Sequence, residues 1–105
     1  SLRSIHAFSD RADLLYKDGE GWLLDLRKKL ITQGIEIPSD ISLAAFTFVR
    51  AAAPQLNGGL MEALDTAALV WIVPKLVLWK YPKERLHDII GDLPKCMQFM
   101  AETEY

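Results

Sequence analysis

Few residues in this sequence have the type and spacing that catalysis requires. Glu84 and Asp88 lie four residues apart with His87 between them, so a helix would place both carboxylates on one face. Two neighbouring carboxylates can act as a general acid and a general base. Charge pairing on a helix surface explains the pattern more simply, because three basic residues lie nearby: Lys80, Lys83 and Arg85. A small enzyme built on Glu84, His87 and Asp88 is therefore only the third of three functional hypotheses.

The remaining reactive side chains form no recognisable site. His6, His87 and Cys96 are too few and too widely separated in the sequence for a zinc site. No phosphate-binding loop of the form G-x-x-x-x-G-K-[ST] is present, because Gly58-Gly59 leads into Leu60. The sequence thus predicts no catalytic, metal-binding or cofactor-binding residue, and no enzyme activity of the chain on its own.

Composition and charge are those of an ordinary folded domain. The 105 residues are 50% hydrophobic and 25% charged, enough for a single domain over residues 1–105. The net charge of -2 creates no overall attraction to nucleic acid or to an anionic membrane. The only basic run, Arg27-Lys28-Lys29, has no interleaved aromatic residues and is interpreted as a solvated helix face.

The single cysteine, Cys96, excludes an internal disulfide and fits a reducing cytoplasm. No amino-terminal apolar segment with a small-residue cleavage site is present, so we expect no export signal. The sequence starts at Ser1 rather than Met, which fits either processing or excision from a longer chain. An excised domain would expose a surface whose partner is missing.

Apolar spacing predicts an all-α fold, a single small bundle of five or six helices. Only Gly34–Pro38 alternates like a strand, and Pro38 closes it. Gly34 should end the second helix, Ser39 or Asp40 should cap the third, and Gly91 should end the fifth. The expected helices cover residues 5–16, 21–33, 41–53, 60 onward, 82–90 and 94–101.

The same spacing predicts which helix faces turn inward. In the second helix we expect an inward face that contains Trp22, Leu23, Leu26 and Leu30, with Ile31 at its edge. In the third helix we expect one stripe that contains Leu43, Phe46, Val49 and Arg50.

The stretch from Glu62 to Trp79 is unusually apolar, with no charge between Asp65 and Lys75. It is too short for a bilayer-spanning helix, which needs about 20 apolar residues. A helix that is apolar on all sides is normally buried, and Pro74 should kink or end it. Two interpretations stay open: a central core helix, or a surface that another protein covers. Aromatic enrichment at interfaces favours the second for Trp71, Trp79 and Tyr81. The predicted interface also contains the residues between them, Pro74, Lys75 and Leu76.

Ala63-Leu-Asp65 followed by Val73-Pro-Lys-Leu76 resembles the "hLD-x-A-h-x-x-x-h-hPKL" segment of carboxy-terminal lid domains in AAA+ NTPases. The pattern is closest to McrB-like and MoxR-like lids; the McrB-like branch drives 5-methylcytosine-dependent restriction systems. This resemblance implies a helical lid that packs on a nucleotide-binding core absent from this chain. ATP or GTP would then be bound only through that core.

One departure from the family changes what the lid is expected to do. Lids of this family usually begin their third helix with a Gly-Tyr-Arg-like sequence whose arginine senses nucleotide. The comparable positions here read Pro38-Ser-Asp-Ile41 and contain no arginine, so we expect no nucleotide sensing from this lid. The competing hypothesis is a self-contained interaction or adaptor module that forms a homodimer through residues 71–79.

Overall fold

The structure is a computed structural model that describes residues 20–105. The helix expected at residues 5–16 lies outside these residues, as does His6. The side chains of Trp22 and Leu23 are also outside the description, so their inward placement stays a prediction.

Residues 20–105 are helical and contain no strand, which confirms the predicted all-α class. Short loops join these helices, and a 3-10 turn, η2, precedes α6. The elements are α2 (Glu20–Thr32), α3 (Ser39–Ala52), α4 (Gly59–Trp71), α5 (Val73–Trp79), η2 (Lys83–Arg85), α6 (Leu86–Ile90) and α7 (Pro94–Glu102).

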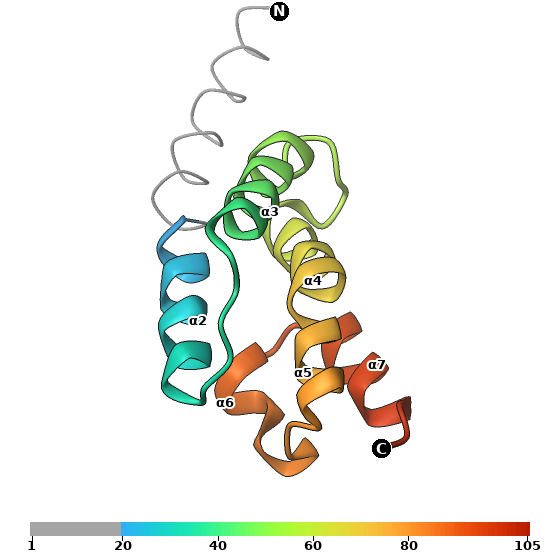
Figure 1. Ribbon diagram of the computed structural model, residues 1–105. Coiled ribbons are helices and arrows are strands. Elements are labelled where there is room, and N and C mark those ends of the chain that lie inside the picture. Colours follow the sequence, from blue (N-terminus) through green and yellow to red (C-terminus); the bar gives the residue numbers. More distant parts are fainter. Residues whose placement is uncertain (1–19) are drawn as a thin grey trace, which may run out of the picture.

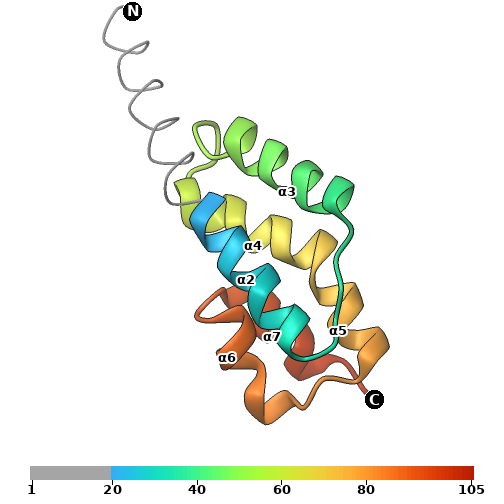
Figure 2. The ribbon, with the colours of Figure 1, turned by 60° about the vertical axis from the view of Figure 1, so that its left-hand side comes forward.

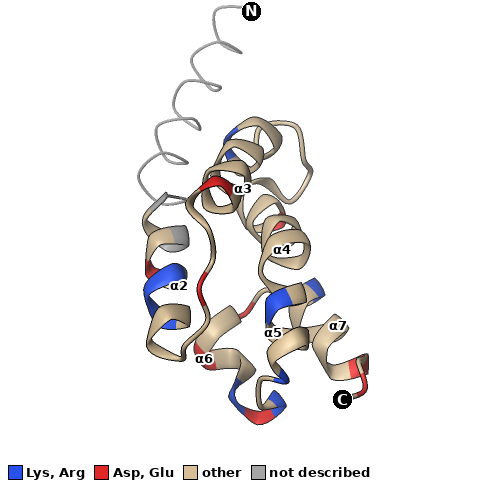
Figure 3. Ribbon diagram, in the orientation of Figure 1, with Lys and Arg blue, Asp and Glu red and all other residues tan. Residues whose placement is uncertain are grey.

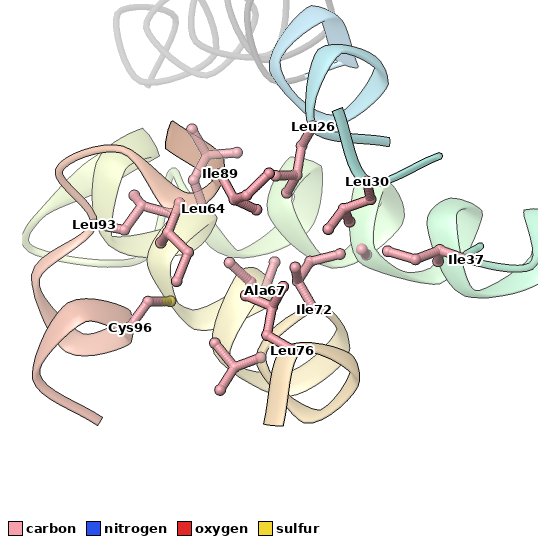
Figure 4. Close-up of a cluster of buried hydrophobic side chains, with 14 of the residues drawn as sticks. Leu26, Leu30, Ile37, Leu64, Ala67, Ile72, Leu76, Ile89, Leu93 and Cys96 are labelled. Carbon is pink, nitrogen blue, oxygen red and sulfur yellow. The ribbon is translucent and has the colours of Figure 1, made fainter. Parts of the chain in front are cut away.

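Helices α3 and α4 form a hairpin, and α5 follows directly after α4, with the helix interrupted between them (Figures 1 and 2). On one side α2 packs against α6 and α3, and on the other α7 packs against α4 and α5. Leu26 and Leu30 of α2 are buried in one core with Leu64 and Ala67 of α4 (Figure 4). Ile31, expected at the edge of the inward face of α2, is instead 51% exposed. Helix α4 therefore has neighbours on several sides, as its apolar sequence predicted.

Helix α2 ends as predicted at Gly34, whose φ is +81°. Its amide donates to the carbonyl of Ile31 (2.9 Å), and the amide of Ile35 donates to the carbonyl of Leu30 (2.8 Å). These bonds satisfy carbonyls that the end of the helix would otherwise leave unpaired.

The alternating segment that follows is extended but pairs with no strand within residues 20–105. Ile35 and Ile37 are buried, whereas Glu36 between them is exposed. The alternation of apolar and polar residues therefore comes from an extended segment that lies against the helices. Its isoleucines turn inward and its glutamate turns to solvent.

Two expectations for α3 are wrong. The helix starts at Ser39 itself with Pro38 at the capping position, so neither Ser39 nor Asp40 acts as its N-cap. In the inward stripe, Val49 is buried as expected, but the other buried residue is Ala45, and Leu43 is 64% exposed. Arg50 is exposed as well. The small Ala45 lets α3 approach α4, so packing of the hairpin and not side-chain size sets the inward face.

The break predicted at Pro74 is present. Helix α4 ends at Trp71, and Ile72 separates it from α5, in which Pro74 occupies the first turn. Pro74 has no N–H to donate to the carbonyl of Val70, so the α4 hydrogen-bond ladder cannot continue through it.

The carboxyl-terminal helices also end and begin at the expected glycine and proline. Residues 82–90, expected as one helix, form η2 and then α6, which ends at Gly91 with φ +69°. Helix α7 begins at Pro94, a residue well suited to a first helical turn. Among the described residues, none of these helices has the length and apolarity needed to cross a membrane.

Candidate docking surface

The six residues expected at an interface divide between surface and core. Leu76 and Tyr81 are fully buried in the chain's own core, because each faces inward against the other helices. Trp71 is half-buried and packs on Phe48 of α3 with ring centroids 5.7 Å apart. Pro74 and Trp79 are exposed, and Lys75 is half-exposed.

The exposed members share one face of α5. Pro74 and Leu78 are four residues apart, as are Lys75 and Trp79, so the two pairs form adjacent rows on the helix. Val73 and Leu76 occupy the opposite, buried face. Leu78 is the most exposed large apolar residue of the described chain at 80%, and Trp79 is 46% exposed.

Beside this face runs a shallow groove of about 210 Å³. One wall is the outer face of α5 and the other is the extended segment after α2. The lining residues are Gly34, Ile35, Glu36, Lys75, Leu78 and Trp79. We call this the α5 groove.

The rim of the α5 groove carries one charge of each sign, Lys75 on α5 and Glu36 on the extended segment. Neither has an ion-pair partner among the described residues. Basic residues mark α2, the start of α5 and the turn near η2, while α4 is largely without charge (Figure 3). The groove thus combines an apolar floor with charged edges, the composition of a protein-binding surface.

Sequence reasoning missed Leu78, although the signal was present. Once Pro74 begins a new helix, Leu76 and Leu78 must point to different sides of it. Because the Leu76 side chain is buried, the Leu78 side chain must face solvent. Predicting one continuous apolar segment concealed this change of face.

The role of Asp65 was also missed. Its carboxylate is 2% exposed, and it accepts hydrogen bonds from the amides of Lys95 (2.8 Å) and Cys96 (3.0 Å). These amides belong to the first turn of α7, where helices leave their N–H groups unpaired. Asp65 therefore caps α7 from α4, and the favourable helix dipole adds to the attraction.

Cys96 and His87, two of the reactive side chains considered in the sequence, lie in different surroundings. Burial raises the pKa of the Cys96 thiol above its ordinary value, and a hydrogen bond and charge repulsion from Asp65 add to the effect. The nucleophilic thiolate is therefore disfavoured. His87 lies 3.4 Å from Asp92, but both side chains are strongly exposed. Among residues 20–105, no three potential ligands come together in a way that would hold a metal ion.

Comparisons of the chain with protein-family models, with curated proteins and with solved structures gave no match.

Proposed function

We propose that this chain is a helical docking module that binds another protein through the outer face of α5. The observation that carries the proposal is the exposure of Leu78 and Trp79 along a groove. A single exposed leucine is ordinary, but an apolar row with an aromatic residue and charged edges is typical of a binding surface.

The partner in this proposal is the nucleotide-binding core of an AAA+ NTPase, with the chain as its lid. The support is the resemblance of Asp65 and Val73–Leu76 to the lid pattern. Each part of that pattern has a defined place: Asp65 anchors α7, Val73 and Leu76 hold α5 to the core, and Pro74 faces outward. The module would transmit nucleotide-dependent rotation from a core that binds ATP or GTP, and would do no chemistry itself. A cytoplasmic location belongs to the same proposal and rests on the unpaired Cys96.

The reading frame upstream of Ser1 tests the lid form of the proposal. We expect the frame to continue into a strand, a Walker A loop and a helix. A frame that stops before such a sequence overturns the lid form.

Sedimentation of the isolated chain tests the alternative, a homodimer through residues 71–79. The lid form predicts a monomer over a hundredfold range of concentration. A dimer that persists on dilution and dissociates on Trp79→Asp substitution would favour the adaptor instead. The opposite charges of Glu36 and Lys75 make this alternative specific, since a two-fold axis would pair each with the other across the interface.

A further inference from the structure

The backbone of the extended segment offers unused hydrogen-bonding groups beside the α5 groove. The N–H and C=O of Glu36 have no hydrogen-bond partner among the described residues. Exposed polar backbone in an extended conformation is the feature to which a second extended chain adds itself.

The direction of these groups follows from the segment's geometry. In an extended chain, successive residues point their N–H and C=O groups to opposite edges. The amide of Ile35 points back to α2, because it donates to the carbonyl of Leu30 (2.8 Å). The groups of Glu36 therefore point away from α2, on the side where Figure 1 shows α5.

The opposite wall of the groove supplies the remaining features of a peptide site. Leu78 and Trp79 provide an apolar surface, and Lys75 lies at its rim without an ion-pair partner. A volume of about 210 Å³ suits one or two side chains and is small for a helix. A helix would moreover satisfy its own backbone groups and leave those of Glu36 unpaired.

We propose that the α5 groove binds an extended peptide segment of the partner protein, which pairs its backbone with Glu36. Alternate apolar side chains of the segment face the groove and pack on Leu78 and Trp79, and an acidic side chain near them faces Lys75. This inference rests on the proposed docking role of the α5 face and adds the kind of partner segment that the face accepts.

A library of random eight-residue peptides, selected against the whole chain, tests the proposal. Selected peptides should carry alternating apolar residues and a nearby acid. Leu78→Ser should weaken the best peptide at least about tenfold, and Lys75→Glu should weaken acidic peptides by a similar factor. Leu43→Ser, which alters another exposed leucine (64%) on α3, should leave binding unchanged.

Hydrogen bonding between the backbones of the peptide and Glu36 is tested separately, by changing the backbone of the selected peptide. Methylation of one backbone nitrogen at a time should reduce affinity about tenfold at the residue opposite Glu36 and have little effect at its two neighbours. Peptides that need Leu78 but space their apolar residues three and four apart overturn the extended segment and leave the docking surface intact. The absence of any peptide that depends on Leu78, or a dimer that closes the groove with a second copy, also overturns the inference.

Discussion

The carboxylate of Asp65 on α4 and the backbone amide of Cys96 on α7 are joined by a buried hydrogen bond of 3.0 Å across 31 positions of sequence. The Cys96 thiol returns the contact, because its Sγ donates to the backbone carbonyl of Asp65 at 3.3 Å. Asp65 and Cys96 thus join α4 to α7 through two hydrogen bonds, one donated by the Cys96 amide and one by its thiol.

Replacing Asp65 with Ala should strongly destabilise the chain. The substitution leaves the amides of Lys95 and Cys96 without their acceptor in the interior, at a cost of about 3 kcal/mol in the free energy of unfolding. Urea denaturation followed by circular dichroism measures the change. Asp88→Ala removes an exposed carboxylate of α6 and should change stability by less than about 0.5 kcal/mol. Equal losses in both variants would contradict the capping role.

Replacement by alanine should change the free energy of unfolding strongly at one leucine of α5 and hardly at another. Leu76→Ala should cost about 2 to 5 kcal/mol, because the side chain is fully buried. Leu78→Ala should change the free energy of unfolding by less than about 0.5 kcal/mol, because its side chain is 80% exposed. Thermal denaturation of the two variants compares them directly. A large loss at Leu78 would place it in the fold and remove it from the docking surface.

The buried thiol should make stability depend on alkaline pH. The folded-state pKa of Cys96 is raised, so its contribution is complete below the unfolded thiol's value, about 8.5, and is lost as pH rises beyond it. One thiol that ionises only on unfolding gives a slope of about 1.4 kcal/mol per pH unit.

Comparison with Cys96→Ala isolates this effect from the titration of lysines and tyrosines. The free energy of unfolding should fall more steeply between pH 9 and pH 10 in the parent chain than in the variant. Parallel profiles would show that the thiol ionises equally in both states.

At two positions with positive φ, gaining a glycine should stabilise the chain and losing one should destabilise it. Lys80, at the end of α5, has φ +57° and ψ +47°, so Lys80→Gly should stabilise the chain by about 0.5 to 1 kcal/mol. Gly91 has φ +69° and ψ -139°, a conformation that L-residues rarely adopt, and Gly91→Ala should cost about 1 to 3 kcal/mol.

A clash with other parts of the fold is excluded at Gly91, because no atom beyond the adjoining residues lies within 4 Å of an added Cβ. Gly21→Ala is the matched control, since its Cβ also meets nothing and Gly21 lies within α2. That variant should be neutral or slightly stabilised in thermal denaturation. A neutral Gly91→Ala variant would contradict the conformational argument.

Glycine and proline predicted where helices end or begin, whereas the cap expected at Ser39 or Asp40 was wrong and tertiary contacts were not predictable. Gly34, Pro74 and Pro94 act through their own backbone geometry, so the ends and starts beside them were predictable. The inward face of α3 was not, because Leu43 is larger than Ala45 yet only Ala45 permits close packing on α4. The resemblance marked Asp65 as part of a pattern, but its hydrogen bonds to α7 join positions that no local rule relates.

The link between Asp65 and α7 sets a limit on how short this module can be made. A version that stopped at Asp92 would retain every residue of the α5 groove and still lose the two amides that solvate the Asp65 carboxylate. Loss of α7 would also uncover the face of α4 on which it packs, so the carboxylate would turn to water and the apolar core residues beside it would be exposed. Grafting this surface onto another scaffold therefore requires the last helix to travel with it, although that helix lines no part of the groove.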